Sequence, residues 1–296
     1  MMRKVAVAAM FVGFGGLSLG AAMTDDQNPP PAAATAGPAA KKALPWWLTS
    51  SQEHPSSQPW LYHIDGTFSY MNGSGNTSGT SYDTSANGWI RRHRFTSHSH
   101  LQLSNKNVNY VTTRTLISYE ERTLREQLDY DLTSRITLMA GVEHYRNTLM
   151  FMDKRLNVYG ALGSTLFHND KHKLTFTAGI GRAEFRFDRA AMLAVNQNAV
   201  TQLDTNPDSG GVLGMQMWTW AVSPRFIFGQ DSSYMQYFDP ALGHRWTINL
   251  TGTLPVNKWL AFTVNYKVKE ETNVFIHALQ VFPQDRMFLM GIKLAI

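Results

Sequence analysis

The tripeptide His98-Ser99-His100 is the first place where side chains of this sequence could do chemistry. Residues two apart in a strand share a face, so both histidines could bind a metal if Asp65 or Asp83 supplied a third ligand. A serine between histidines also suggests a hydrolase, which needs the serine hydroxyl, a base and an orienting polar group placed together. No local signature accompanies either arrangement, so we predict no catalytic residue, no metal site and no cofactor.

A second set of chemically capable residues is ionisable and occupies alternate positions in segments that otherwise alternate apolar and polar residues. Because alternate side chains of a strand share a face, these residues should lie opposite the apolar face. The set consists of Asp65, His98, His100, Arg125, Asp129, Asp131, Glu143, Lys267 and Lys293. If the apolar faces contact lipid, this set lines an interior lumen.

The segments that must position these residues have a period of two. In WTINLTGTL (246–254), the apolar residues Trp246, Ile248 and Leu250 share one parity, while threonines and Asn249 hold the other. This is the pattern of a strand with one apolar face. It recurs at 260–268 and 288–296 and, less sharply, at 60–71, 78–90, 94–104, 109–132, 135–146, 155–168, 172–187, 212–228 and 232–239. The sequence therefore predicts about twelve strands.

The segment 117–132 also fits a helix, because Leu124, Leu128 and Leu132 are spaced by four residues. We favour a strand there, since leucines and Tyr130 face one way while polar residues alternate with them. By contrast, "RAAMLAVNQNAV", within the long connection 187–211, could form a short helix.

A soluble sandwich also alternates, but three features favour a membrane-spanning barrel. The segments reach about ten residues, which suffices for a tilted strand to cross the hydrocarbon. Short turns at 132–135, 168–173 and 254–258 alternate with longer connections near 146–154, 187–211 and 271–285. Aromatic residues gather near strand ends, as in interfacial girdles: Trp60, Tyr62, Tyr145, Tyr159, Trp218, Trp220, Trp246, Trp259 and Tyr266. The predicted fold class is all-β, a transmembrane antiparallel up-and-down β-barrel.

The first 59 residues predict where the protein resides. Arg3 and Lys4 precede an apolar run and then small residues up to Ala22, which is the layout of a cleaved secretory signal over 1–22. A Pro- and Ala-rich periplasmic linker over 23–59 should follow, with the barrel over 60–296. The Trp46-Trp47 pair in the linker could lie at a membrane interface or have no role. Export to the bacterial outer membrane excludes nucleic acid as a partner.

The chain has no cysteine, which excludes thiol catalysis and disulfides, and its formal charge is +5. If the N-terminus is periplasmic, the connections near 72–80, 104–109, 146–154, 187–211, 239–245 and 271–285 face outward. Basic residues near them would form a collar around the barrel that binds lipopolysaccharide phosphates. The collar candidates are Lys106, Arg146, Lys154, Arg155, Arg186, Arg189, Arg245 and Lys269. The other expected partners are outer-membrane lipids and, through the C-terminal strand, the barrel-assembly machinery.

Several stretches carry a family resemblance. They are "GTFSYMNGSGNTSGTSY" (66–82), "DLTSRITLMAGVEHYRN" (131–147), "HNDKHKLTFTAGIGRAEFRF" (168–187) and "LPVNKWLAFTVNYKV" (254–268). With these residues the chain resembles the domain of unknown function 481 family, whose members are described as salt-induced outer-membrane proteins. The resemblance implies an outer-membrane β-barrel. In the first stretch, glycines and asparagines tolerate positive φ, which predicts a water-exposed hairpin loop at 72–80.

The sequence leaves more than one function open for such a barrel. The interpretation we favour is a narrow pore, or a channel that binds small polar solutes or ions, with a charged lumen. The alternative is a closed structural barrel of the stressed envelope, filled by mutual salt bridges and without transport. An outer-membrane lipid-modifying enzyme is less favoured, and we expect no enzymatic activity.

Overall fold

The computed structural model describes residues 60–73, 77–110, 115–169, 171–195, 197–201, 203–223, 225–275 and 284–295. The predicted signal peptide and linker lie outside these residues. Within the described ranges, no helix is both long and apolar enough to cross a membrane.

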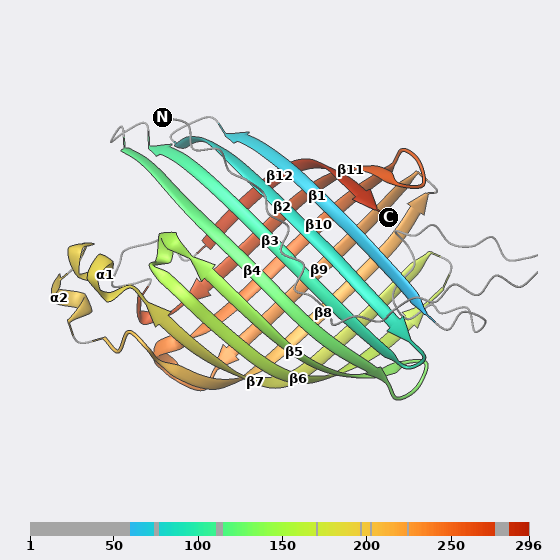
Figure 1. The fold of residues 1–296 in the computed structure, drawn as a ribbon, viewed down its shortest axis with the longest axis horizontal. Coiled ribbons are helices and arrows are strands. Elements are labelled where there is room, and N and C mark those ends of the chain that lie inside the picture. Colours follow the sequence, from blue (N-terminus) through green and yellow to red (C-terminus); the bar gives the residue numbers. More distant parts are fainter. Residues whose placement is uncertain are drawn as a thin grey trace, which may run out of the picture. The chain divides into compact units, whose positions relative to one another are not determined.

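The described residues form a closed antiparallel barrel in which each strand pairs with the next and β1 pairs with β12 (Figure 1). The strands are β1 (Leu61–Gly73), β2 (Thr77–Arg92), β3 (Phe95–Tyr110), β4 (Thr115–Asp131), β5 (Ile136–Asn147), β6 (Met152–His168), β7 (His172–Phe187), β8 (Asp208–Ser223), β9 (Phe226–Tyr237), β10 (His244–Pro255), β11 (Leu260–Thr272) and β12 (Gln284–Ala295). The predicted fold class and strand number are confirmed. The segment 117–132 is the strand β4, as favoured, and not a helix.

The exterior of the barrel is largely apolar because the alternating residues face outward on every strand. Examples of outward side chains that remain half exposed are Phe68, Leu162, Ile180, Phe262 and Met290. Such a belt on a closed barrel is the surface of a membrane-spanning barrel, because lipid replaces water there. Polar residues interrupt the belt at the Ser99–Glu126 hydrogen bond and at the Gln230–Ser232 hydrogen bond.

Short polar turns join the strands at one end of the barrel, which we call the turn end. The side-chain oxygen of Asn169 accepts hydrogen bonds from the backbone N–H groups of Lys171 and His172, and Asn257 does the same for Trp259 and Leu260. These asparagines take over hydrogen bonds that the strand ladder no longer provides. The two turns agree with the short connections expected from the sequence.

Longer connections lie at the opposite end, which we call the loop end. They include the 3-10 helices η1 (Thr148–Met150) and η2 (Pro240–Leu242) and the short helices α1 (Arg189–Val195) and α2 (Gln197–Val200), and α1 and α2 project from this end in Figure 1. The helix predicted within 187–211 is therefore present. Gly243, after η2, has a φ of 55°, and a Cβ there would lie 1.9 Å from the Thr272 carbonyl oxygen, so only glycine fits.

Four expectations about boundaries and aromatics need correction. Strand pairing continues to Gly73 and resumes at Thr77, so most of the stretch 72–80 is strand, and only its centre lies outside the described residues. The β3–β4 connection falls between Tyr110 and Thr115 and not at 104–109. The turn between β8 and β9 lies at 223–226, whereas the sequence pattern had suggested 228–232. Two of the expected girdle aromatics, Tyr145 and Tyr159, are inside the barrel: Tyr145 is fully buried, and the Tyr159 hydroxyl donates to Gln127.

A lysine introduced on the belt should test the membrane-facing assignment. Ile180→Lys, in the middle of β7 where the side chain is 67% exposed, should lower the free energy of unfolding in lipid bilayers by about 2–4 kcal/mol. Val256→Lys is the matched control, because Val256 is similarly exposed but lies in the β10–β11 turn, where the expected cost is about 0–1 kcal/mol. Equal effects of the two substitutions would contradict the lipid-facing belt.

Candidate functional site in the barrel interior

The residues of the His98-Ser99-His100 tripeptide do not act together. The Ser99 hydroxyl donates to Glu126 on the exterior, at 2.7 Å. Both histidines face inward, where His98 contacts the Asp129 carboxylate at 3.0 Å and the His100 Nδ1 lies 2.6 Å from the Asn87 amide oxygen. Alternation thus separates the serine from the histidines by the thickness of the sheet. No group of three or more potential ligand side chains in the described part of the chain could hold a metal.

All nine lumen-lining candidates lie at inward-facing positions, but the structure brings them together in small groups. At the turn end, Lys293 pairs with Asp65 at 3.2 Å. Arg91, which the sequence pattern had not indicated, pairs with Asp131 at 2.6 Å. His98 and Asp129 form a third pair. Arg125 and Glu143 pair with each other nearer the loop end, and Lys267 donates to Gln102 at 3.4 Å.

Glu143 is the centre of the largest charged group inside the barrel. Its carboxylate accepts hydrogen bonds from the Arg125 guanidinium at 2.7 and 3.2 Å. Arg245 and Arg155 approach its other oxygen at 3.3 and 3.5 Å. Arg155 is 0% exposed and also contacts Glu271 at 3.5 Å. Three guanidinium groups therefore share one buried carboxylate, and a second carboxylate balances one of them.

Tyr145 joins this group to a second ion pair. Three cations lie over its ring, with Arg155 at 4.2 Å, Lys269 at 4.3 Å and Arg245 at 5.0 Å from the centroid. Such contacts are favourable because the face of the ring carries partial negative charge. Lys269 also donates to the Tyr145 hydroxyl and pairs with Glu121 at 3.0 Å. We call the residues Glu121, Arg125, Glu143, Tyr145, Arg155, Arg245, Lys269 and Glu271 the cross-barrel network.

The network spans the interior because its partners come from strands that are not neighbours. Lys269 of β11 meets Glu121 of β4, although β12, β1, β2 and β3 stand between these strands in the ring. Arg245 of β10 likewise reaches Glu143 of β5. Side chains from opposite walls therefore meet at this level and narrow the lumen.

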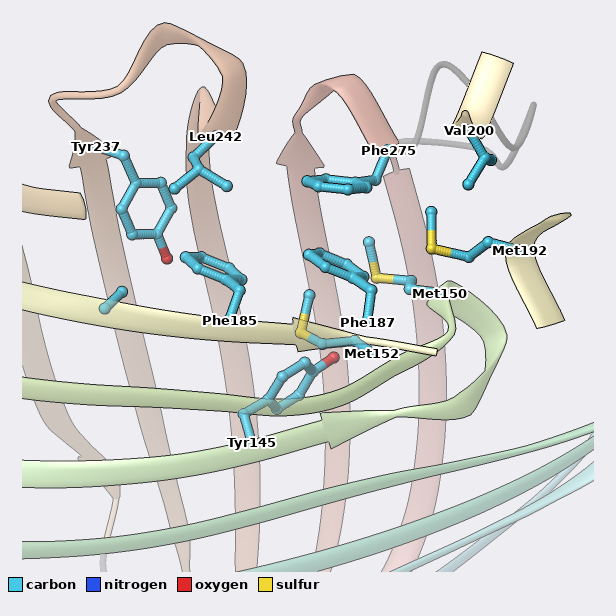
Figure 2. Close-up of a cluster of buried hydrophobic side chains, with 11 residues drawn as sticks. Tyr145, Met150, Met152, Phe185, Phe187, Met192, Val200, Tyr237, Leu242 and Phe275 are labelled. Carbon is cyan, nitrogen blue, oxygen red and sulfur yellow. The ribbon is translucent and has the colours of Figure 1, made fainter. Parts of the chain in front are cut away.

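Above the network, toward the loop end, buried apolar side chains fill the interior (Figure 2). Phe187 of β7 stacks on Phe275 with ring centroids 3.9 Å apart, and Phe185 meets the edge of Tyr237 at 5.4 Å. The loop-end helices add further side chains to this apolar plug, which consists of Met150, Met152, Phe185, Phe187, Met192, Val200, Tyr237, Leu242 and Phe275. The plug and the network together fill the interior between the described strands on the loop-end side.

A cavity of about 80 Å³ lies next to the network. Arg125, Glu143, Asn157, Tyr159 and Arg245 supply its polar wall. The other wall includes the apolar side chains of Leu213, Met215 and Met235, together with Ser233. A mostly apolar pocket with a few convergent polar groups is the usual form of a small-molecule site.

The proposed lipopolysaccharide collar requires correction. Lys106, Arg155, Arg245 and Lys269 lie inside the barrel, where Lys106 is 3% exposed over the Tyr119 ring and the other three belong to the network. Their side chains cannot reach lipid phosphates on the exterior. Arg146, Lys154, Arg186 and Arg189 remain on the outer surface, but Lys154 is paired with Glu184 and Arg146 lies 3.9 Å from Asp153.

The alternation could have placed on the inward face both the misassigned residues Lys269 and Tyr145 and the residues Glu121 and Glu271, which had not been selected. Lys269 and Glu271 continue the parity of Lys267, and Glu121 and Tyr145 continue that of Arg125 and Glu143. Their nearness to strand ends suggested an outer collar, because the sequence does not show how far the strands extend. No signal in the sequence indicated which of these residues would meet across the interior.

Removing the shared carboxylate should destabilise the barrel strongly. Glu143→Gln leaves three guanidinium groups close together without their common counter-charge, and breaking a buried pair typically costs about 3–5 kcal/mol. Urea unfolding in detergent should show this loss. Glu184→Gln is the control, because its carboxylate is 57% exposed and pairs only with Lys154 among the described residues, so its loss should cost less than about 1 kcal/mol. A Glu143→Gln protein as stable as the control would refute the role given to the network.

Comparisons with known proteins found the following similarities. Solved structures with a similar barrel include the NanC porin, at a TM-score of 0.45 and 7% identity, covering 79% of this chain and 99% of that one. The KdgM porin gives a TM-score of 0.41 and 10% identity over 78% of this chain and 98% of that one. The translocator domain of the autotransporter NalP from Neisseria meningitidis gives a TM-score of 0.42 and 8% identity, covering 82% of this chain and 90% of that one. No curated protein matches significantly. The sequence profile of the family described as "Protein of unknown function, DUF481" matches residues 66–275, most of the chain, and the protein therefore belongs to this family.

Proposed function

We propose that this protein is an outer-membrane β-barrel that forms a narrow channel for small polar solutes and is closed at rest at its loop end. The apolar belt supports the membrane location, because lipid-facing strands carry an apolar outer face. Closure of the barrel supports it too, because every strand can then satisfy its backbone hydrogen bonds within the sheet, as lipid requires. An outer-membrane location is the usual one for bacterial barrels of this kind.

The observation that carries the channel proposal is the difference between the loop end and the middle of the interior. At the loop end, Tyr145 and Arg155 are completely buried beneath the apolar plug. In the middle of the barrel, the inward-facing Asp231 and Ser233 are exposed to solvent. The interior thus contains a polar, solvent-accessible space beneath the plug and the network, and movement of the plug and the network would open a path from this space to the loop end.

A closed barrel without transport is the second candidate. It is favoured by the number of cross-barrel ion pairs, which would have to break and rearrange before any solute could pass. In that case the network serves only to hold opposite walls together, and the vestibule has no functional exit.

Planar-bilayer recordings separate the two candidates. The wild-type protein should show rare, small conductance steps, whereas Phe187→Ala combined with Phe275→Ala should raise the open probability because it removes the stacked centre of the plug. The matched control is Phe262→Ala combined with Phe288→Ala, since these side chains are outward-facing and about half exposed, and it should leave the conductance unchanged.

Correct folding of each variant can be checked by heat-modifiable migration on gels. If the wild-type protein and the plug variant are both folded and neither conducts, the channel is refuted and the closed structural barrel stands.

A further inference from the structure

The cavity beside the cross-barrel network combines features that suit one chemical class of ligand. We propose that it binds a small organic carboxylate, with the carboxylate on Arg245 and Arg125 and a short apolar body against Leu213, Met215 and Met235. The inference names the class of solute that the proposed channel would carry, and in that respect it rests on the proposed function. Binding itself does not require transport.

The first argument is the balance of charge around the cavity. The interior near the loop end holds six cationic side chains among the described residues: Lys106, Arg125, Arg155, Arg245, Lys267 and Lys269. Five carboxylates lie among or beside them: Asp83, Glu121, Glu143, Asp231 and Glu271. The difference among these described residues is one positive charge. An excess of buried positive charge is costly unless counter-charge is supplied, and an anionic ligand would supply it.

The second argument is the hydrogen bonding of Arg245. One of its terminal nitrogens lies 3.3 Å from Glu143, and this is its single ion pair within the described residues. Its Nε is buried and has no hydrogen-bond partner there. The Nε edge of a guanidinium, together with one terminal nitrogen, forms a fork that matches the two oxygens of a carboxylate. Arg245 lines the cavity, but its Nε is enclosed and does not face the open space, so a ligand inside would meet this fork after a turn of the Arg245 side chain.

The third argument is the opposite wall of the cavity. Leu213, Met215 and Met235 come from β8 and β9 and supply apolar surface facing the arginines. An inorganic oxyanion would gain nothing from that wall, whereas a carboxylate with two or three carbon atoms would bury apolar surface on it. The volume of about 80 Å³ exceeds the roughly 10–15 Å³ needed for one water molecule. It suits a short-chain acid better than a sugar.

The plug fills the interior on the loop-end side of the cavity, so we expect a ligand to enter through the solvent-exposed middle of the interior. Asp231, on the inward face of β9, lies in this exposed region and makes no ion pair with the described residues. Its repulsion would slow entry and limit affinity, so Asp231→Asn should strengthen carboxylate binding.

Binding of butyrate to the full-length barrel in detergent, measured by titration calorimetry, tests the proposal. The wild-type protein should bind butyrate saturably, and Arg245→Gln should weaken binding by roughly tenfold or more, as expected for loss of a charge-assisted hydrogen-bond pair. Lys293→Gln is the matched control: it also removes an inward-facing cation, but one that pairs with Asp65 at the turn end, and it should leave binding unchanged.

Ser233→Leu is a second variant, and it leaves the charge of the protein unchanged. Ser233 lines the cavity from β9, so a leucine there should fill the space and abolish binding even if Arg245→Gln folds poorly. Inorganic phosphate is the comparison ligand. Phosphate binding without butyrate binding would overturn the carboxylate assignment, and so would equal affinities of the wild-type, Arg245→Gln and Ser233→Leu proteins.

The test is independent of transport. Binding is read in detergent, where no conductance is involved, so a channel that conducts but does not bind butyrate refutes this inference alone. If the barrel binds butyrate saturably but never conducts, the channel is refuted and the carboxylate site is still supported.

Discussion

Closure of the sheet is the constraint on which the rest of the structure depends. A strand edge left open in hydrocarbon would expose unpaired N–H and C=O groups, each costing several kcal/mol. Pairing of β1 with β12 removes that edge. Once the ring is closed, successive side chains of each strand face either the lipid or the interior, because they alternate between the two faces of the sheet. Buried charge on this protein therefore concentrates inside, where side chains from opposite walls can neutralise one another.

The interior uses this possibility unevenly along its length. At the turn end, pairs such as Arg91–Asp131 and Lys293–Asp65 join residues of nearby strands. At the loop end, the ring of Tyr145 gathers three cations, and the pairs reach across the barrel. Charges buried so deeply repay their desolvation only when nearly every hydrogen bond is satisfied. The Nε atoms of Arg155 and Arg245 have no hydrogen-bond partner among the described residues, and they mark where the network is incomplete.

The apolar plug explains why the loop-end connections are long. A two-residue turn could not place Met192 or Val200 over the mouth of the barrel, whereas α1 and α2 can. The stack of Phe187 on Phe275 joins β7 to the end of β11 and covers the network from water. Exclusion of water strengthens the ion pairs beneath, since electrostatic attraction rises as the effective dielectric falls. Plug and network therefore support each other.

The sequence predicted the architecture well because period-two alternation reports directly on the two faces of a strand. It placed Arg125, Glu143 and Lys267 on the inward face and proposed the helix near 189–200. Strand ends were harder: extension of β11 to Thr272 and of β6 to Met152 moved Lys269 and Arg155 from an expected outer collar to the interior. Cross-barrel pairs such as Lys269–Glu121 depend on the curvature and stagger of the closed ring, which no local pattern encodes.

The central claim is that alternation divides a lipid-facing exterior from a water-accessible interior. Because the chain has no cysteine, single cysteines can be placed at Thr251, inward on β10, and at its outward neighbour Leu250, both of which are half-buried. The measurement is the reaction rate of each thiol with a charged, membrane-impermeant reagent in lipid vesicles. The account predicts rapid labelling of Thr251→Cys and protection of Leu250→Cys, and equal or reversed rates would contradict it.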